Sequence, residues 1–82
     1  MGRTGVGMNK ERRFKISKII NDIENIKSNL QDVLSDEEFA FDNMPENLQC
    51  SMRGEESESA IECMNEAIDA LDEALDQLGD IN

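Results

Sequence analysis

Several residue types on which enzyme chemistry depends are missing from this 82-residue chain, which has no histidine, tyrosine or tryptophan. A nucleophile and its base would therefore have to combine a cysteine or serine with a lysine or a carboxylate. No such group comes together at a pocket-forming place in the sequence pattern. The sequence therefore predicts a non-enzymatic protein with no catalytic residues and no cofactor.

The cysteine content argues against a metal centre. The two cysteines, Cys50 and Cys63, lie outside any C-x-x-C spacing, and a zinc site without histidine would lack its usual ligands. We expect both side chains to be reduced thiols and predict no metal site.

Long apolar runs are also absent. No stretch approaches the ~18 apolar residues that a membrane span needs, and the N-terminus lacks the apolar core of a signal peptide. We therefore expect a cytoplasmic protein with no membrane partner. The first residues, MGRTGVG, carry three glycines and no apolar period, which predicts a disordered tail over residues 1–8.

Two heptad patterns dominate the rest of the chain. In the first half, apolar residues recur at alternating intervals of three and four, which is typical of a helix that packs lengthwise on another helix. This packing line consists of Ile16, Ile19, Ile23, Ile26, Leu30 and Val33. Beside it stand Ile20, Leu34 and Phe41, which widen the apolar stripe so that the helix can contact two neighbours.

The second half repeats the pattern, and three alanines accompany it at every seventh position. Its packing line consists of Ile61, Met64, Ile68, Leu71, Leu75 and Leu78, and the alanines are Ala60, Ala67 and Ala74. Small residues in a row allow a facing helix to approach closely. Gly79, just after the last leucine, predicts the helix end.

The single proline separates the two patterns. Met44 precedes Pro45 and is restricted away from helical dihedral angles, so the first helix should end near Asp42 or Asn43. The second helix has two candidate starts, a cap at Ser51 or the S-x-x-E capping box at Ser59. We predict helices over about residues 9–42 and 52–79, joined by a turn over about residues 43–51.

These patterns predict one all-α domain, residues 9–82, folded as an antiparallel two-helix hairpin. A chain of this size is near the lower limit for a stable core of its own. Because the apolar stripe is also wide, we expect a homodimer in which two hairpins form a four-helix bundle.

Charge is distributed unequally along the chain, whose net charge is −11. Up to Lys27 there are seven basic and three acidic residues, a net charge of 7 − 3 = +4; from Ser28 there are one basic and sixteen acidic residues, a net charge of 1 − 16 = −15. In a hairpin, the basic residues of 10–18 would lie beside acidic residues of 69–80.

The turn end would gather acidic residues with Arg53 as its one cation. This predicted acidic patch consists of Asp32, Asp36, Glu37, Glu38, Asp42, Glu55, Glu56, Glu58 and Glu62. Its self-repulsion is relieved by salt, by a bound cation or by a basic partner. Leu48 and Met52, nearby, would cover the end of the hairpin or serve as a partner-binding tip.

Two other uses of charge are weaker. Five acids could chelate a divalent ion in a bundle core, but the heptad assigns them to the solvent side; they are Glu62, Glu66, Asp69, Glu73 and Asp76. The basic segment KERRFK could bind phosphates, yet the acidic remainder would repel the same duplex. We therefore do not expect direct binding to nucleic acid.

The run DNMPENLQ, followed by S-x-R-G-E and a heptad of the AID-LDEAL type, resembles small acidic helical proteins of phages and conjugative elements in Gram-positive bacteria. In that group, similar D-N-x-P-E-[NS]-L-Q segments join two helices. The resemblance covers most of the chain after Met8. It implies a mobile-element setting, in which small non-enzymatic proteins often bind and block a host nucleic-acid-handling protein, but it carries over no functional residues.

Two hypotheses follow. In the first, the acidic patch imitates the phosphate charge of a duplex and occupies the basic groove of a nuclease, a CRISPR effector or a DNA-binding regulator. In the second, the protein is a structural or adaptor bundle that acts only through self-association, and its acids keep it in solution.

Overall fold

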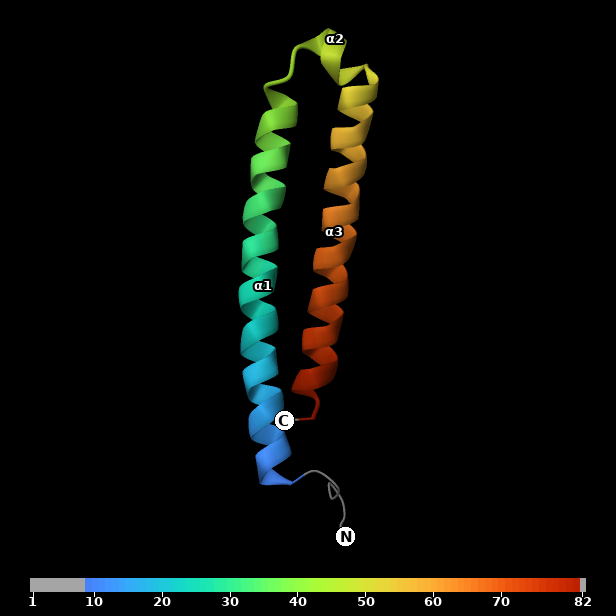
Figure 1. The fold of residues 1–82 in the computed structure, drawn as a ribbon. Helices are drawn as coiled ribbons and strands as arrows, with labels where there is room; N and C mark the ends of the chain where they lie inside the picture. The colour runs from blue at the N-terminus through green and yellow to red at the C-terminus, as the bar shows by residue number, and fades with distance from the viewer. Residues whose placement is uncertain (1–8, 82) are drawn as a thin grey trace.

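The computed structural model describes residues 9–81, which contain three helices and no strand. The helices are α1 (Lys10–Asp42), α2 (Glu46–Gln49) and α3 (Met52–Gly79). The two long helices lie side by side, and α2 lies across one end of the pair (Figure 1). The all-α class is confirmed. The expected tail, residues 1–8, lies outside the described residues.

Helix α1 begins and ends where local chemistry requires it. The side-chain oxygen of Asn9 accepts a hydrogen bond from the Arg12 amide at 2.8 Å, which satisfies one of the free N–H groups of the first turn. At the other end, the backbone and side-chain nitrogens of Asn43 both donate to the Phe39 carbonyl. The next residue, Met44, precedes Pro45 and cannot readily continue the helix.

The segment between the long helices differs from the plain turn that we expected over residues 43–51. It contains α2, which starts after Pro45, whose backbone has φ −57° and ψ 147°. Proline is well suited to a helix start because its missing N–H would have no partner there. The side chain of Gln49 then donates to the Phe41 carbonyl at 2.9 Å, which fastens α2 to the end of α1.

Helix α3 begins at Met52, with the extended residue Ser51 before it. Ser51 therefore marks the start, and Ser59 lies in the helix interior. Gly54 is buried against α2: a Cβ atom at this position would lie 2.0 Å from the Gln49 carbonyl oxygen. Glycine is needed here because the backbone of α2 leaves no room for a side chain.

Only part of the expected packing line of α1 is covered by α3. Leu34 and Ile68, with 9% and 8% of their surface exposed, are the only apolar side chains classed as buried within residues 9–81. On α1, the residues that lie at least half-buried along the contact are Ile16, Ile20, Ile23, Lys27, Leu30, Leu34, Glu37 and Phe41. The other members of the expected line, Ile19, Ile26 and Val33, are exposed by 47%, 55% and 54%.

The physical reason is geometric. Three neighbouring rows of apolar residues run along α1, and a single partner helix covers only two of them. On α3, by contrast, the expected residues from Ile61 to Leu78 are all buried or half-buried.

One ion pair joins the two long helices within residues 9–81, between the Lys27 ammonium and the Asp72 carboxylate. Helix α1 extends past the end of α3, so its first turns have no helix beside them in this part of the chain (Figure 1). The expected pairing of residues 10–18 with acids of α3 is therefore absent from residues 9–81; Lys15 instead pairs with Glu11 on its own helix at 3.7 Å.

Candidate functional site

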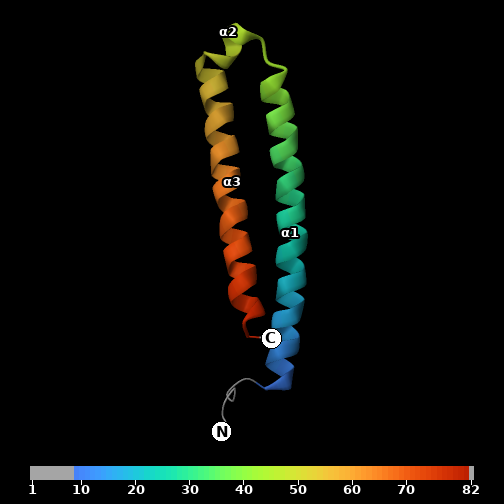
Figure 2. The ribbon, with the colours of Figure 1, turned by 180° about the vertical axis from the view of Figure 1, so that it is seen from behind.

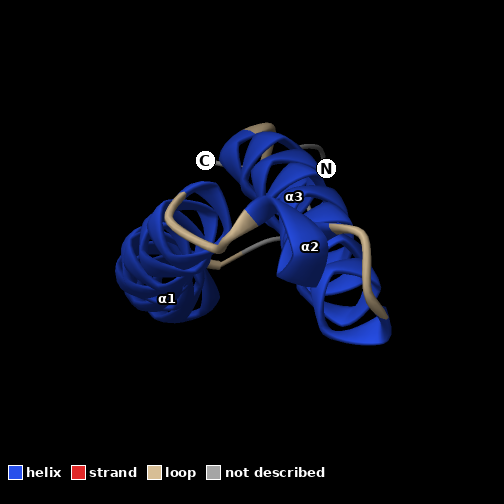
Figure 3. Cartoon of the chain, turned by 90° about the horizontal axis from the view of Figure 1, so that it is seen from above, coloured by secondary structure: helices blue, strands red, loops and turns tan. Residues whose placement is uncertain are grey.

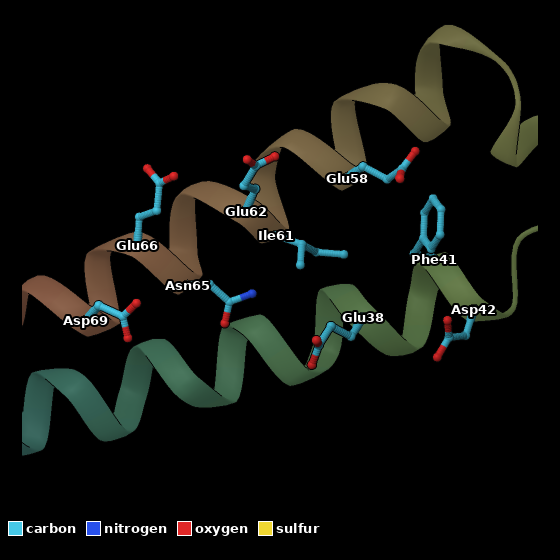
Figure 4. A pocket seen from close by; sticks show the side chains of 9 residues that line it. All are labelled: Glu38, Phe41, Asp42, Glu58, Ile61, Glu62, Asn65, Glu66 and Asp69. Atoms are coloured by element: carbon cyan, nitrogen blue, oxygen red, sulfur yellow. The ribbon is translucent and has the colours of Figure 1, made fainter.

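A groove lined mainly by carboxylates runs between α1 and α3 near α2. Four acids on α3 follow one another at intervals of four, four and three residues, which places them on one side of the helix. The residues lining this acidic groove are Glu38, Phe41, Asp42, Glu58, Ile61, Glu62, Asn65, Glu66 and Asp69. Figure 4 shows Phe41 and Ile61 between the two helices, while Glu62 and Glu66 project from α3 away from α1.

Within residues 9–81, no cation forms an ion pair with any of the six carboxylates of the acidic groove. The ion pairs within residues 9–81 are Lys15–Glu11 and Lys27–Asp72, and neither involves a residue of the groove. All six carboxylate residues are exposed, so solvent weakens their mutual repulsion without removing it. The groove is therefore a site of concentrated, uncompensated negative charge.

The structure divides the predicted acidic patch. Glu38, Asp42, Glu58 and Glu62 line the acidic groove, whereas Glu37 and Glu56 line a second groove on the other side of the helix pair. Glu55 lies with Glu56 beside Met52 on the outer surface of α3. Asp32 and Asp36 line neither of the two grooves between the helices.

Glu37 differs from the other acids because it faces α3. Its carboxylate accepts a hydrogen bond from the Ser57 hydroxyl at 2.5 Å, and Ser57 is one of the most buried residues of the described chain. The contact fixes the position of the two helices relative to each other and makes Glu37 a structural residue.

Two residues of the acidic groove, Glu66 and Asp69, were missing from the predicted patch. Sequence reasoning placed them among the acids on the solvent side of α3. The available signal was their spacing, because each continues the row that Glu58 and Glu62 begin.

No metal-binding group or membrane span was found in the described chain. Within residues 9–81, no three Cys, Asp or Glu side chains are grouped so that they could hold a metal ion. Both cysteines are free and exposed. None of the helices among these residues has an apolar segment of the length needed to span a membrane.

The second groove lies on the opposite side of the helix pair, and half of its lining residues are apolar. Its lining residues are Glu37, Ala40, Met44, Leu48, Arg53, Glu56, Ser57 and Ala60. Viewed from above, α2 lies beside α3 at the end of the pair where the two long helices are connected (Figure 3). Leu48 contributes to this groove, whereas Met52 is largely exposed.

Comparison with known proteins gives no relative from which a role could be transferred: no protein-family model, curated protein or solved structure matches this chain.

Proposed function

We propose that this protein is a non-enzymatic, acidic protein-binding module that blocks a basic nucleic-acid-binding protein by charge mimicry. The observation that supports the proposal is the acidic groove, in which six carboxylates lie on one side of the helix pair and form no ion pair with a cation of residues 9–81. A surface of this kind attracts a positively charged partner and gains stability when the partner neutralises it.

The density of charge in the groove approaches that of nucleic acid. From Glu58 to Asp69 the helix rises by about 17 Å at 1.5 Å per residue, and four of the six carboxylates lie along this length of α3. That is roughly one negative charge per 4 Å on α3 alone, compared with about one per 3.4 Å along a single strand of duplex DNA. A cleft that binds one strand would therefore meet a similar charge.

The proposal includes an assembly and a setting. The chain would work as an antiparallel helical hairpin that pairs with a second copy into a four-helix bundle. It would act in the cytoplasm and come from a mobile element, in line with the resemblance of its DNMPENLQ segment to proteins of phages and conjugative elements. Its partner would be a nuclease, a CRISPR effector or a DNA-binding regulator of the host.

A competition experiment tests the proposal. The immobilised protein is exposed to a host lysate at low salt, and the retained proteins are eluted with duplex DNA or with salt. We expect a basic nucleic-acid-binding protein that both treatments release. Retention unaffected by DNA would contradict mimicry.

Matched variants make the test specific to the groove. Glu62→Lys together with Glu66→Lys changes two groove residues, and Asp32→Lys together with Glu73→Lys makes the same change of net charge outside it. We expect the first pair to abolish retention and the second to leave most of it. Equal losses would show that net charge matters rather than the groove.

The alternative is a structural or adaptor bundle that acts only through self-association. The exposed side chains of Ile19, Ile26 and Val33 favour this alternative, because they offer a second apolar contact surface. The same experiment distinguishes the two functions, since a purely structural bundle would retain only its own chain.

A further inference from the structure

The side of the helix pair opposite the acidic groove carries an apolar row along α1. Ile19, Ile26 and Val33 recur at every seventh residue and are about half exposed. Ala40 continues the row and lines the second groove. Large apolar side chains that recur at every seventh residue are typical of a contact surface rather than of a solvent-facing helix.

Helix α3 extends this surface with small residues. Ala60 lines the second groove together with Ala40, so these two residues lie on the same side of the helix pair. The seven-residue period then places Ala67 and Ala74 in line with Ala60, and Ile81 follows just past the helix end. We call the surface formed by the two rows the apolar face; it consists of Ile19, Ile26, Val33, Ala40, Ala60, Ala67, Ala74 and Ile81.

In the part of the chain that the structure describes, no element covers this face: Figures 1 and 2 show the helix pair from its two sides, with only α2 across one end. The 28 residues of α3 make the face about 42 Å long at 1.5 Å per residue, and the molecule is 16 Å wide. Two such faces in contact would bury roughly 1,300 Å², which is within the range of stable interfaces. The occupant that this area fits is a second copy of the chain.

We propose that two copies pack through the apolar face with their α2 ends at opposite ends of the dimer, so that α1 lies against α1 and α3 against α3. This inference rests on the dimer proposed above, and not on the binding of a basic partner. The alternative places both α2 ends together and α1 against the partner's α3. Charge favours the first arrangement, because the alternative brings the acidic α2 ends of the two copies together.

On α1, the row of isoleucines and valine fixes the register of the opposite-end arrangement. With the two-fold axis at Ile26, Ile19 of one copy meets Val33 of the other. The same register places Lys15 of each copy beside Asp36 of its partner, since both residues border the row on the same side. Opposite charges are thus paired at both ends of the contact.

On α3, an independent observation gives the same axis. The hydrogen bond between Glu37 and Ser57 makes Ile26 level with Ile68, because 37 − 11 = 26 and 57 + 11 = 68. The Lys27–Asp72 pair makes Ile26 level with Glu73, because 27 − 1 = 26 and 72 + 1 = 73. The middle of the row Ala60, Ala67, Ala74 and Ile81 falls between these two levels. The three large side chains of α1, Ile19, Ile26 and Val33, and the row on α3 are therefore centred at about the same height, as a two-fold axis requires.

Disulfide cross-linking tests the arrangement in a chain whose own thiols are removed by Cys50→Ser and Cys63→Ser. A disulfide needs Cα atoms within about 7 Å, so the Ile26→Cys variant should form a covalent dimer with itself. Ile19→Cys mixed with Val33→Cys should give a mixed dimer, and neither should link alone. Glu24→Cys, on the side of the acidic groove, is the control and should stay monomeric on a denaturing gel.

The outcomes separate this inference from the proposed assembly and function. A monomer in sedimentation of the unlinked protein would overturn both the dimer and this inference. A dimer in which Ile26→Cys links to Ala67→Cys or Ala74→Cys, but not to itself, would overturn the inference and keep the assembly. Linking of Glu24→Cys as efficient as that of Ile26→Cys would also overturn it. If Ile26→Cys forms the expected covalent dimer but the protein captures no basic partner from the lysate, only charge mimicry is overturned.

Discussion

At the scale of single residues, Gly54 is the position with the least freedom. An alanine Cβ would lie 2.0 Å from the Gln49 carbonyl oxygen, and the obstructing atoms belong to backbone. Gly54→Ala should therefore displace α2 and lower the free energy of unfolding by about 1–3 kcal/mol. Thermal denaturation followed by circular dichroism measures this as a melting temperature lower by at least several degrees.

Gly79→Ala provides the control for Gly54→Ala, since a Cβ there meets nothing within 4 Å. Alanine favours a helix over glycine by up to about 1 kcal/mol, so this variant should be unchanged or slightly more stable. If both variants melted at the wild-type temperature, the result would contradict the close contact between Gly54 and the backbone of α2.

Ser57 is the second residue with a specific role. It donates to the Glu37 carboxylate from a buried position, and hydrogen bonds to charged groups contribute about 1.5–3 kcal/mol when buried. Because Glu37 remains partly exposed, Ser57→Ala should cost about 1 kcal/mol in urea denaturation. Ser59→Ala, at an exposed position of the same helix, should change the midpoint little. Equal effects of both substitutions would contradict the role of the hydrogen bond.

At the scale of helices, the sequence contains most of the information about where elements begin and end. The restriction that Pro45 places on Met44 predicts a helix end near Asp42, and α1 ends at Asp42. The short helix α2 was not predicted, because a segment of four residues is stabilised by contacts such as Gln49 with Phe41 rather than by its own pattern.

The side on which α1 meets α3 could not be predicted either. The rows containing Ile19, Ile23 and Ile20 are all mainly apolar, and periodicity gives no preference between two adjacent rows. The same limit applies to the candidate site: the acids could be recognised by their number, but the side of the helix pair on which each lies could not. Glu37, predicted for the acidic patch, faces α3, whereas Glu66, predicted for the solvent side, lines the acidic groove.

Lys27 tests this rotation of α1. It lies in the row that faces α3 and pairs with Asp72. Lys27→Asp should replace an attraction by a repulsion and lower stability by about 1–2 kcal/mol. Adding Asp72→Lys should restore most of the loss, which a double-mutant cycle in urea would measure. A double variant no more stable than Lys27→Asp alone would place the two residues apart.

At the scale of the whole molecule, negative charge opposes folding. The chain carries a net charge of −11, and the acidic groove concentrates six of the carboxylates, none of which is paired with a cation in the described part of the chain. Self-repulsion of this kind destabilises a compact state and is screened by salt, because the Debye length falls from about 10 Å at 0.1 M to about 3 Å at 1 M. The groove residues should therefore be more favourable for binding a partner than for stability.

The triple variant Glu62→Gln, Glu66→Gln and Asp69→Asn tests this opposition between stability and binding. It removes three charges from the groove at nearly constant side-chain shape, so it should melt a few degrees higher than the wild type at low salt. The difference should shrink in 1 M NaCl, where screening has already relieved the repulsion. Capture of a basic partner should fall in the same variant. The matched control removes three acids outside the groove, with Asp22→Asn, Asp32→Asn and Glu73→Gln, and should retain capture. A triple variant that was less stable than the wild type at low salt would mean that the groove acids stabilise the folded chain, and the proposed cost of concentrating them would be absent.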